Sequence, residues 1–367
     1  MYKFLILPLI PHAGFLNVFK YITFRIGLSA LTAMVISLIL GPWVIRKLKE
    51  LKYGEQVRKE ETSKVLHDLH KGKQGTPTMG GILFTFSVVI STVFWADITH
   101  PYILIALSGI LLFGLIGFVD DYTKITRKRS LGLTARQKFL TQAFFALAIG
   151  FYLIQYSDIA AFAKNIYLPF VKGSFLNNSE VLYLLFIVFV ITGTSNAVNL
   201  TDGLDGLAIG CTIIASTAFT IICYVVGNKV FSDYLFLEYI AESAELSIFC
   251  AAMAGAGLGF LWFNMYPAQV FMGDTGALSI GGALGIVAVL VKKELYLILI
   301  GGVFLWEALS VILQVTSFKL TKKRIFLCAP YHHHLQFKGW AETKITVRLW
   351  IIAAIFALLG LCSLKLR

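Results

Sequence analysis

The stretch 102-YILIALSGILLFGLIGFVDDYTK-124 decides which class of fold this chain adopts. Its first 18 residues, 102–119, carry no charged side chain, and Asp120 and Asp121 follow them directly. Crossing the hydrocarbon core of a bilayer takes a helix of about 20 mostly apolar residues. We therefore predict a membrane-spanning helix with two neighbouring carboxylates where it leaves the membrane. The alternative for this acidic pair is an ordinary solvated helix end.

The rest of the chain carries the same pattern. Of its 367 residues, 57% are hydrophobic and 14% are charged, whereas soluble globular proteins contain about 25% charged residues. We predict a single all-α integral membrane domain over 1–367 with about ten transmembrane helices. The ten predicted spans are 22–45, 79–96, 102–119, 138–156, 181–194, 207–227, 245–263, 276–291, 294–318 and 345–364.

Basic residues predict the orientation of these spans. Alternate loops share one side of the membrane, and the side that holds 46–78, 120–138 and 319–344 carries 21 Lys and Arg residues, against 10 on the side that holds both termini. Cytoplasmic loops are the richer in Lys and Arg, so the first side is predicted to be cytoplasmic and both termini periplasmic. The same asymmetry explains the net charge of +12 without a nucleic-acid partner.

The segments richest in polar, glycine and acidic residues all fall on that cytoplasmic side. They are 72–81, 120–138, 196–206, 264–277 and 330–340. We therefore predict an active-site cleft that several loops form at the cytoplasmic face. A transporter or flippase, the alternative from another class, would place polar groups at mid-membrane, and many transporters contain an inverted repeat, which this sequence lacks.

Acidic residues of two of these segments have no basic neighbour in the sequence. Asp202 and Asp205 lie in the stretch 173–228, and Asp274 lies in the stretch 230–291. Neither stretch contains Lys or Arg, and only Lys229 separates the two. Basic loops elsewhere in the chain, a bound Mg²⁺ ion or both must offset their charge, and Mg²⁺ commonly combines one or two carboxylates with substrate phosphate oxygens. The alternatives are a turn in the Asn- and Asp-rich segment and a helix cap at Asp274.

Lys73, Thr76 and Thr78 lie beside glycines at the start of a predicted span. A lysine, hydroxyl groups and glycine amides at a helix N-terminus suit a phosphate group. The arrangement is not a Walker A motif, because the lysine precedes the loop instead of closing it.

Three adjacent histidines, His332, His333 and His334, occupy the last polar segment. Adjacent side chains cannot all point the same way on a helix or strand, so we expect separate roles and not one three-histidine metal site. Glu307 is an acid inside a predicted span, which indicates either a function or a bond to a neighbouring helix.

Five segments together resemble a known family. They are 75-GTPTMGG-81, 116-IGFVDDYTK-124, 196-NAVNLTDGLDGLA-208, 271-FMGDTGAL-278 and 331-YHHHLQFKGW-340. In this order they are similar to the motifs of the phospho-MurNAc-pentapeptide transferases, within the polyprenyl-phosphate N-acetylhexosamine-1-phosphate transferase superfamily. The resemblance covers essentially the whole chain. It implies ten spans, dependence on Mg²⁺, a homodimer and a location in the bacterial inner membrane.

The resemblance also implies the reaction. Phospho-MurNAc-pentapeptide would be transferred from UDP-MurNAc-pentapeptide to undecaprenyl phosphate, a membrane lipid, to give lipid I and UMP. The rival within the superfamily is a sister enzyme that transfers GlcNAc-1-phosphate. It shares the acidic motifs, so 75–81 and the histidine-bearing segment discriminate between the two.

Individual roles follow from the same resemblance. Asp120, Asp121 and Asp274 match the catalytic acids, and Asp274, with Asp121 and Asp202, is expected to hold Mg²⁺. The residues assigned to substrate binding are Lys73, Thr78, Lys124, Lys138, Asn196, Asn199, Asp202, Asn264, Phe271, Gly273, His332, His333 and His334. Many members carry Glu where this chain has Gln336, so we expect no charged role there.

Phosphoryl transfer depends on positioning and charge neutralisation more than on covalent protein chemistry. We expect Asp120 to ready the lipid phosphate for attack, as a base or by positioning it. Lys73 and Lys124 would screen phosphate charge, and Phe271 would either stack on uracil or serve in packing. A two-step route with an Asp nucleophile stays open.

Overall fold

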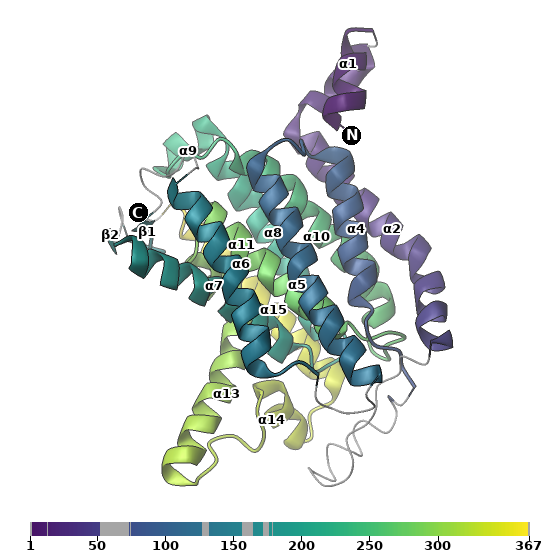
Figure 1. Cartoon of the computed structure of the whole chain (residues 1–367), viewed down its shortest axis with the longest axis vertical. Coiled ribbons are helices and arrows are strands. Elements are labelled where there is room, and N and C mark those ends of the chain that lie inside the picture. Colours follow the sequence, from purple (N-terminus) through teal and green to yellow (C-terminus); the bar gives the residue numbers. More distant parts are fainter. Residues whose placement is uncertain are drawn as a thin grey trace.

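The computed structural model describes residues 2–12, 14–51, 73, 75–126, 132–155, 164–171, 176–177 and 179–365. These residues form a bundle of long helices, with short helices at its two ends (Figure 1). The apolar helices of the bundle are α2 (Ile22–Glu50), α4 (Gly81–Trp95), α5 (Pro101–Thr126), α6 (Ala135–Gln155), α7 (Glu180–Thr201), α8 (Leu207–Val226), α10 (Ser243–Asn264), α11 (Gly273–Leu290), α13 (Gly302–Thr321) and α15 (Glu342–Cys362).

The remaining elements are short. They comprise a π-helical turn at Tyr2–Ile6, α1 (Leu7–Leu9), 3-10 turns at Ile10–His12 and Gly14–Lys20, α9 (Lys229–Leu235), α12 (Tyr296–Ile300), α14 (Tyr331–Phe337), and the antiparallel strands β1 (Asn165–Ile166) and β2 (Leu176–Asn177).

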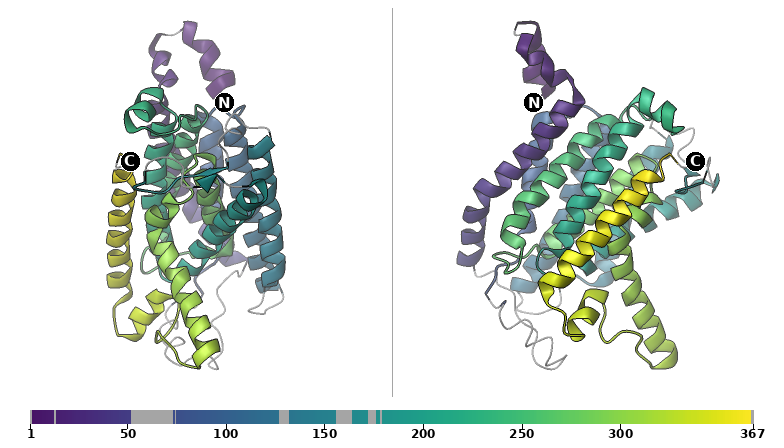
Figure 2. Two further views of the ribbon diagram at one scale, coloured as in Figure 1. Left: turned by 90° about the vertical axis from the view of Figure 1, so that its left-hand side faces the viewer. Right: turned by 180° about the vertical axis from the view of Figure 1, so that it is seen from behind.

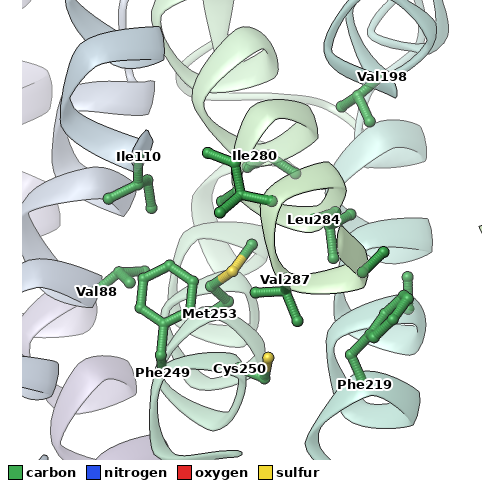
Figure 3. Close-up of a cluster of buried hydrophobic side chains, with 14 of the residues drawn as sticks. Val88, Ile110, Val198, Phe219, Phe249, Cys250, Met253, Ile280, Leu284 and Val287 are labelled. Atoms are coloured by element: carbon green, nitrogen blue, oxygen red, sulfur yellow. The ribbon is translucent and has the colours of Figure 1, made fainter. Parts of the chain in front are cut away.

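Helix α11 forms the centre of the bundle. Every residue from Thr275 to Leu290 is buried, and α11 packs against both α5 and α7. In Figure 3, Ile280, Leu284 and Val287 lie among apolar side chains of the surrounding helices. A helix that is apolar on every face is buried on every face, which explains why the sequence of α11 shows no polar stripe.

Glycines on α11 allow its neighbours to approach closely. A Cβ atom at Gly281 would lie 2.6 Å from the backbone of Ser195 in α7, and one at Gly282 would lie 2.5 Å from the ring of Phe113 in α5. Small residues at such contacts are a common device of membrane helix packing. They fix the position of α11 and therefore of its first turn.

The predicted spans agree with the helices, with one correction. In the described part of the chain, nine helices are long and apolar enough to cross a membrane, and α4, with 15 residues, is a shorter apolar helix. The predicted span 294–318 is not one helix: it divides into α12 and α13 at Gly301. A Cβ atom at the next residue, Gly302, would lie 2.6 Å from the ring of Phe356 in α15, so the chain comes close to α15 at the break.

Beyond this break, α13 diverges from the bundle toward the end opposite both chain termini, and α14 packs against its first half (Figures 1 and 2). Several basic residues that entered the prediction of orientation lie outside the described residues. They are Lys52, Arg58, Lys59, Lys64, Lys71, Arg127, Lys128, Arg129, Lys172 and Arg367.

A buried ion pair ties helices together at the end where α2 and α10 begin. Arg25 of α2 makes two hydrogen bonds to the carboxylate of Glu245 in α10, at 2.6 and 3.0 Å. Arg25 also donates to the backbone oxygen of Trp95 at the end of α4 (3.0 Å). Such bidentate pairs are geometrically specific, so this contact fixes the relative placement of α2, α4 and α10.

Candidate active site

Three carboxylates meet where α5 ends and α11 begins. One oxygen atom each of Asp120, Asp121 and Asp274 lies within 4.8 Å of the other two. The helices come this close because Gly117 has no side chain: a Cβ atom there would collide with the backbone oxygen of Asp274. Asp120 and Asp121 follow Gly117 by one helical turn and share its face. The three acids that the sequence singles out are therefore gathered in one cluster.

Asp121 binds the first turn of α11. Its Oδ2 accepts hydrogen bonds from the backbone N–H of Thr275 (2.9 Å) and from the hydroxyl of Thr275 (2.8 Å), and its Oδ1 accepts one from the N–H of Asp274 (3.3 Å). A carboxylate at this position pairs N–H groups that lack helical partners and interacts favourably with the helix dipole. The cap considered for Asp274 is thus supplied by Asp121 from another helix.

Two lysines contact the other acids of the cluster. Lys124 Nζ lies 2.6 Å from Asp120 and 2.9 Å from Asp274, while Lys138 Nζ lies 2.6 Å from Asp274 and 3.4 Å from Asp120. The sequence left two sources of balancing positive charge open, basic residues from elsewhere in the chain and a bound Mg²⁺ ion. The structure shows that the basic residues are present. Three carboxylates and two ammonium groups leave the cluster with a formal charge of −1.

The donor set of the cluster fits a divalent metal ion. Mg²⁺ prefers oxygen ligands and is usually held by one or two carboxylates together with substrate phosphates and water. Asp120 and Asp274 direct oxygens to a point that already attracts two ammonium groups. Asp202, which was assigned to the metal, is not one of the three clustered acids: it is the residue that follows α7.

Thr78 and Gly273 lie against this cluster. Gly273 has a positive φ of +72°, and a Cβ atom there would lie 2.7 Å from Oδ2 of Asp121 and 2.8 Å from Oγ1 of Thr78. Glycine is required here both for the backbone conformation and for space. The backbone of the segment holding Thr78 pairs with that before α11, because the N–H of Phe271 donates to the oxygen of Pro77 (2.8 Å). Two of the predicted polar segments thus form one unit.

Lys73 lies at a second acidic group. Its Nζ is 2.6 Å from Asp205 and 2.6 Å from Glu342, and 5.8 Å from the centre of the Phe271 ring. Burial lowers the pKa of Lys73, but the charges and hydrogen bonds of Glu342 and Asp205 outweigh it and raise the pKa above its usual value. The lysine is therefore a fixed cation, suited to contact with a phosphate.

A cavity of about 330 Å³ opens beside this lysine. Lys73, Asp205, Tyr266, Gln336, Trp340 and Glu342 are among its lining residues. The N–H of Asp205 donates to Glu342 (2.7 Å), and the other carboxylate oxygen of Asp205 accepts from the N–H of Ala268 (2.9 Å). Parts of the chain far apart in sequence therefore meet around the cavity.

The predicted asparagines make bonds within the protein. Asn264 is buried, accepts from the N–H of Gly206 (3.2 Å) and donates to the oxygen of Val270 (2.8 Å), which joins two of the polar segments. Asn196 donates to Gln142 of α6 (2.9 Å). Asn199 lies in the last turn of α7, half-buried. Their contact with substrate stays a prediction.

His332 is buried and paired with Glu307. The ring Nδ1 lies 3.1 Å from Oε2 of the Glu307 carboxylate, to which the backbone N–H of His332 also donates (3.3 Å). The acid inside a predicted span thus contacts the histidine segment. That segment is not a loop throughout, since 331–337 form α14.

The other two histidines have different partners. His333 Nδ1 lies 2.7 Å from Oε1 of Gln336, and His334 Nδ1 accepts from the N–H of Leu327 (3.1 Å). Burial and the charge of Lys338 lower the pKa of His334, which keeps Nδ1 available as an acceptor. The three rings thus have different hydrogen-bond partners.

Glu342 and Asp205 were not among the assigned site residues, although the structure places them on Lys73. Asp205 carried a signal, because it lies in the acidic segment beside Asp202. Glu342 carried none, since an acid in the first turn of a helix is ordinary. Only the folded chain brings it within reach of a residue 269 positions away.

Comparison with known proteins shows which families the chain matches. The model for glycosyl transferase family 4 matches residues 103–292, which include all three clustered acids. A phospho-N-acetylmuramoyl-pentapeptide-transferase signature matches residues 73–84, which include Lys73 and Thr78.

Curated relatives extend the similarity over the full length. A phospho-N-acetylmuramoyl-pentapeptide-transferase of Desulfatibacillum aliphaticivorans is 51% identical over 99% of both chains. Proteins of the same name from Desulforapulum autotrophicum and Koribacter versatilis are 49% and 48% identical, over 98% and 96% of this chain and 98% and 95% of theirs.

Proposed function

Because this chain belongs to the phospho-N-acetylmuramoyl-pentapeptide-transferase family, we propose that it transfers phospho-MurNAc-pentapeptide from UDP-MurNAc-pentapeptide to undecaprenyl phosphate. The products are lipid I and UMP. The observation that carries this proposal is identity of about half of all residues over nearly the whole length of three relatives with that name. The chain is a multi-pass membrane protein and a phosphoglycosyl transferase.

The reaction forms one bond and breaks another at the same phosphorus. An oxygen of the lipid phosphate attacks the phosphorus bonded to the sugar, and the bond from that phosphorus to UMP breaks. Lys124 and Lys138, held between Asp120 and Asp274, are placed to contact phosphate oxygens and offset their charge. Asp120 orients the attacking phosphate, and Lys73, at the cavity, holds the nucleotide portion.

We assign a Mg²⁺ site to Asp274 and Asp120, with Asp121 fixing the turn that carries Asp274. The ion would supply charge neutralisation at the diphosphate. The close packing at Gly117 and Gly273 supports this assignment, because it brings the helix ends that carry the three carboxylates together.

Substrate choice tests the function most directly. Purified protein in detergent, supplied with undecaprenyl phosphate and Mg²⁺, should release UMP from UDP-MurNAc-pentapeptide and not from UDP-GlcNAc. The match of the signature to 73–84 supports this choice over the sister enzyme. Liquid chromatography of released UMP measures both reactions. Preference for UDP-GlcNAc would move the chain to the sister function, and ion or solute movement without UMP release would favour a transporter.

We further propose that the cluster and α14 face the cytoplasm of the bacterial inner membrane and that the protein forms a homodimer. The Lys and Arg asymmetry supports the orientation, and the family resemblance supports the dimer. In a variant without the five native cysteines, a single cysteine at the exposed Lys338 should react with a membrane-impermeant maleimide only after the cells are opened.

A cysteine at the exposed Lys229, in α9 at the other end of the bundle, is the matched control and should react in intact cells. Labelling of the Lys338 position from outside would contradict the orientation and the shared cytoplasmic face of the site.

A further inference from the structure

Glu307 has no role in the reaction as described so far. It lies in α13, in a helix apolar enough to span a membrane, and its side chain is fully buried. An ionisable side chain in such a helix is expensive and usually functional. Its partner is His332: Oε2 lies 3.1 Å from the ring Nδ1 and 3.3 Å from the backbone N of His332, whose N–H donates to it.

This contact fixes the ring of His332. An ionised carboxylate can only accept hydrogen bonds, so Nδ1 of the ring carries the hydrogen. A carboxylate at one ring nitrogen fixes the tautomer and orientation of a histidine and compensates positive charge on it. The other nitrogen, Nε2, is then the atom through which His332 acts.

Nε2 of His332 is buried and forms no hydrogen bond with any residue that the structure describes. It is directed at Gly203, where a Cβ atom would overlap the ring. A buried polar atom without a partner is unfavourable and calls for an explanation, such as a ligand that completes the bond. Here the surroundings point to the substrate.

The turn at 202–206, against which Nε2 lies, also forms one side of the cavity beside Lys73. Asp205 of this turn lines the cavity, and so does Gln336, which follows His332 by four residues on the same face of α14. His332 is therefore a close neighbour of residues on two sides of the cavity, although its own buried ring does not line it. A nucleotide sugar bound there would bring oxygen atoms to the turn.

On the premise of the proposed function, we propose that Glu307 is a positioning residue for the transfer reaction: it holds His332 so that Nε2 accepts a hydrogen bond from a hydroxyl group of the bound nucleotide sugar. A purely structural link between α13 and α14 would not require a buried charge, since a neutral amide would serve. Glu307 also leaves its Oε1 buried and without a hydrogen bond to the described residues, so its carboxylate is retained at some cost in stability.

A double-mutant cycle tests this role. Glu307→Gln keeps the size and an acceptor but removes the charge, and it should lower kcat/KM for UDP-MurNAc-pentapeptide by about tenfold or more, the range typical of residues that orient a histidine ligand. The loss should appear in KM for the nucleotide sugar and leave KM for undecaprenyl phosphate unchanged. In a His332→Ala background, Glu307→Gln should have no further effect, because residues that act through one contact are not additive.

Two further variants keep the test decisive. Gly203→Ala places a methyl group against the ring, displaces Nε2 without touching Glu307, and should produce the same selective rise in KM. Glu245→Gln changes a buried acid at the other end of the bundle and should lower the thermal unfolding temperature without changing either KM. Calorimetric titration of each variant with UDP-MurNAc-pentapeptide, without lipid acceptor, provides a binding constant that is independent of turnover.

The outcomes separate this inference from the function on which it rests. Absence of UMP release by the unaltered protein would contradict the proposed function. If that protein is active, then equal rises in both KM values, an effect of Glu307→Gln that persists without His332, or unchanged kinetics in both Glu307→Gln and Gly203→Ala would each overturn the positioning role.

Discussion

Replacement of Asp274 by Asn should reduce the rate of UMP release by about 100-fold or more, the lower range for a positioned acidic group. Asp274 lies 2.9 Å from Lys124 and 2.6 Å from Lys138, two lysines that also contact Asp120. The amide of Asn has nearly the same volume but no charge, so it neither balances the two ammonium groups nor attracts a metal ion. The rate is measured with both substrates and Mg²⁺ at saturation.

Asp233→Asn is the matched control, since Asp233 is an exposed acid that pairs with Lys229 in α9, away from the cluster. Its rate should equal that of the unaltered protein. Near-normal turnover by folded Asp274→Asn protein would remove this residue from the mechanism.

The neighbouring acids should be distinguishable by stability. Asp120→Asn and Asp121→Asn are each expected to lose about 100-fold in rate as well. Asp121 also caps α11, so Asp121→Ala should in addition lower the free energy of unfolding by about 1 kcal/mol, as when other helix caps are replaced by Ala. Thermal unfolding in detergent measures the difference.

Removal of divalent metal should abolish activity, and addition of Mg²⁺ or Mn²⁺ should restore it. Both ions prefer oxygen ligands, which the carboxylates of the cluster and the phosphates of the substrate provide. Asp274→Asn should raise the Mg²⁺ concentration required for half of its residual rate. UMP release is followed in excess chelator, and the control is the same chelator loaded with Mg²⁺ beforehand.

Full activity in thorough chelation would contradict the metal assignment. Lys124 and Lys138 would then have to neutralise the phosphate groups without a metal ion. Their ammonium groups already lie at the cluster, beside Asp120 and Asp274.

The fold was largely predictable because a spanning helix is specified locally. Each of the predicted apolar runs contains a helix, since a bilayer leaves an apolar run of that length few alternatives. The break between α12 and α13 was missed because 294–318 is apolar throughout, and hydropathy does not register a change of direction. Gly301 and Gly302 marked the place, but a close approach to Phe356 is a property of packing.

The sequence indicated which acidic residues form the cluster, but it did not indicate which hydrogen bonds they make. Asp120, Asp121 and Asp274 stood out because charge is rare beside membrane spans. That Asp121 caps α11 follows from the close approach of two helices whose contacting residues are 154 positions apart, and it could not be derived from either helix alone. The metal role expected for Asp202 stays a prediction, because Asp202 is not one of the three clustered acids.

The pair formed by Arg25 and Glu245 has a consequence for how the chain is made. The two residues are 220 positions apart, and bacterial or eukaryotic chains grow by about 5–20 residues per second, so Arg25 waits roughly 10–40 s for its partner after it leaves the ribosome. During that interval the guanidinium of Arg25 lacks the carboxylate with which it pairs in the folded chain, because α10 has yet to be translated. The placement of α2 against α10 is therefore fixed only late in the synthesis of the chain.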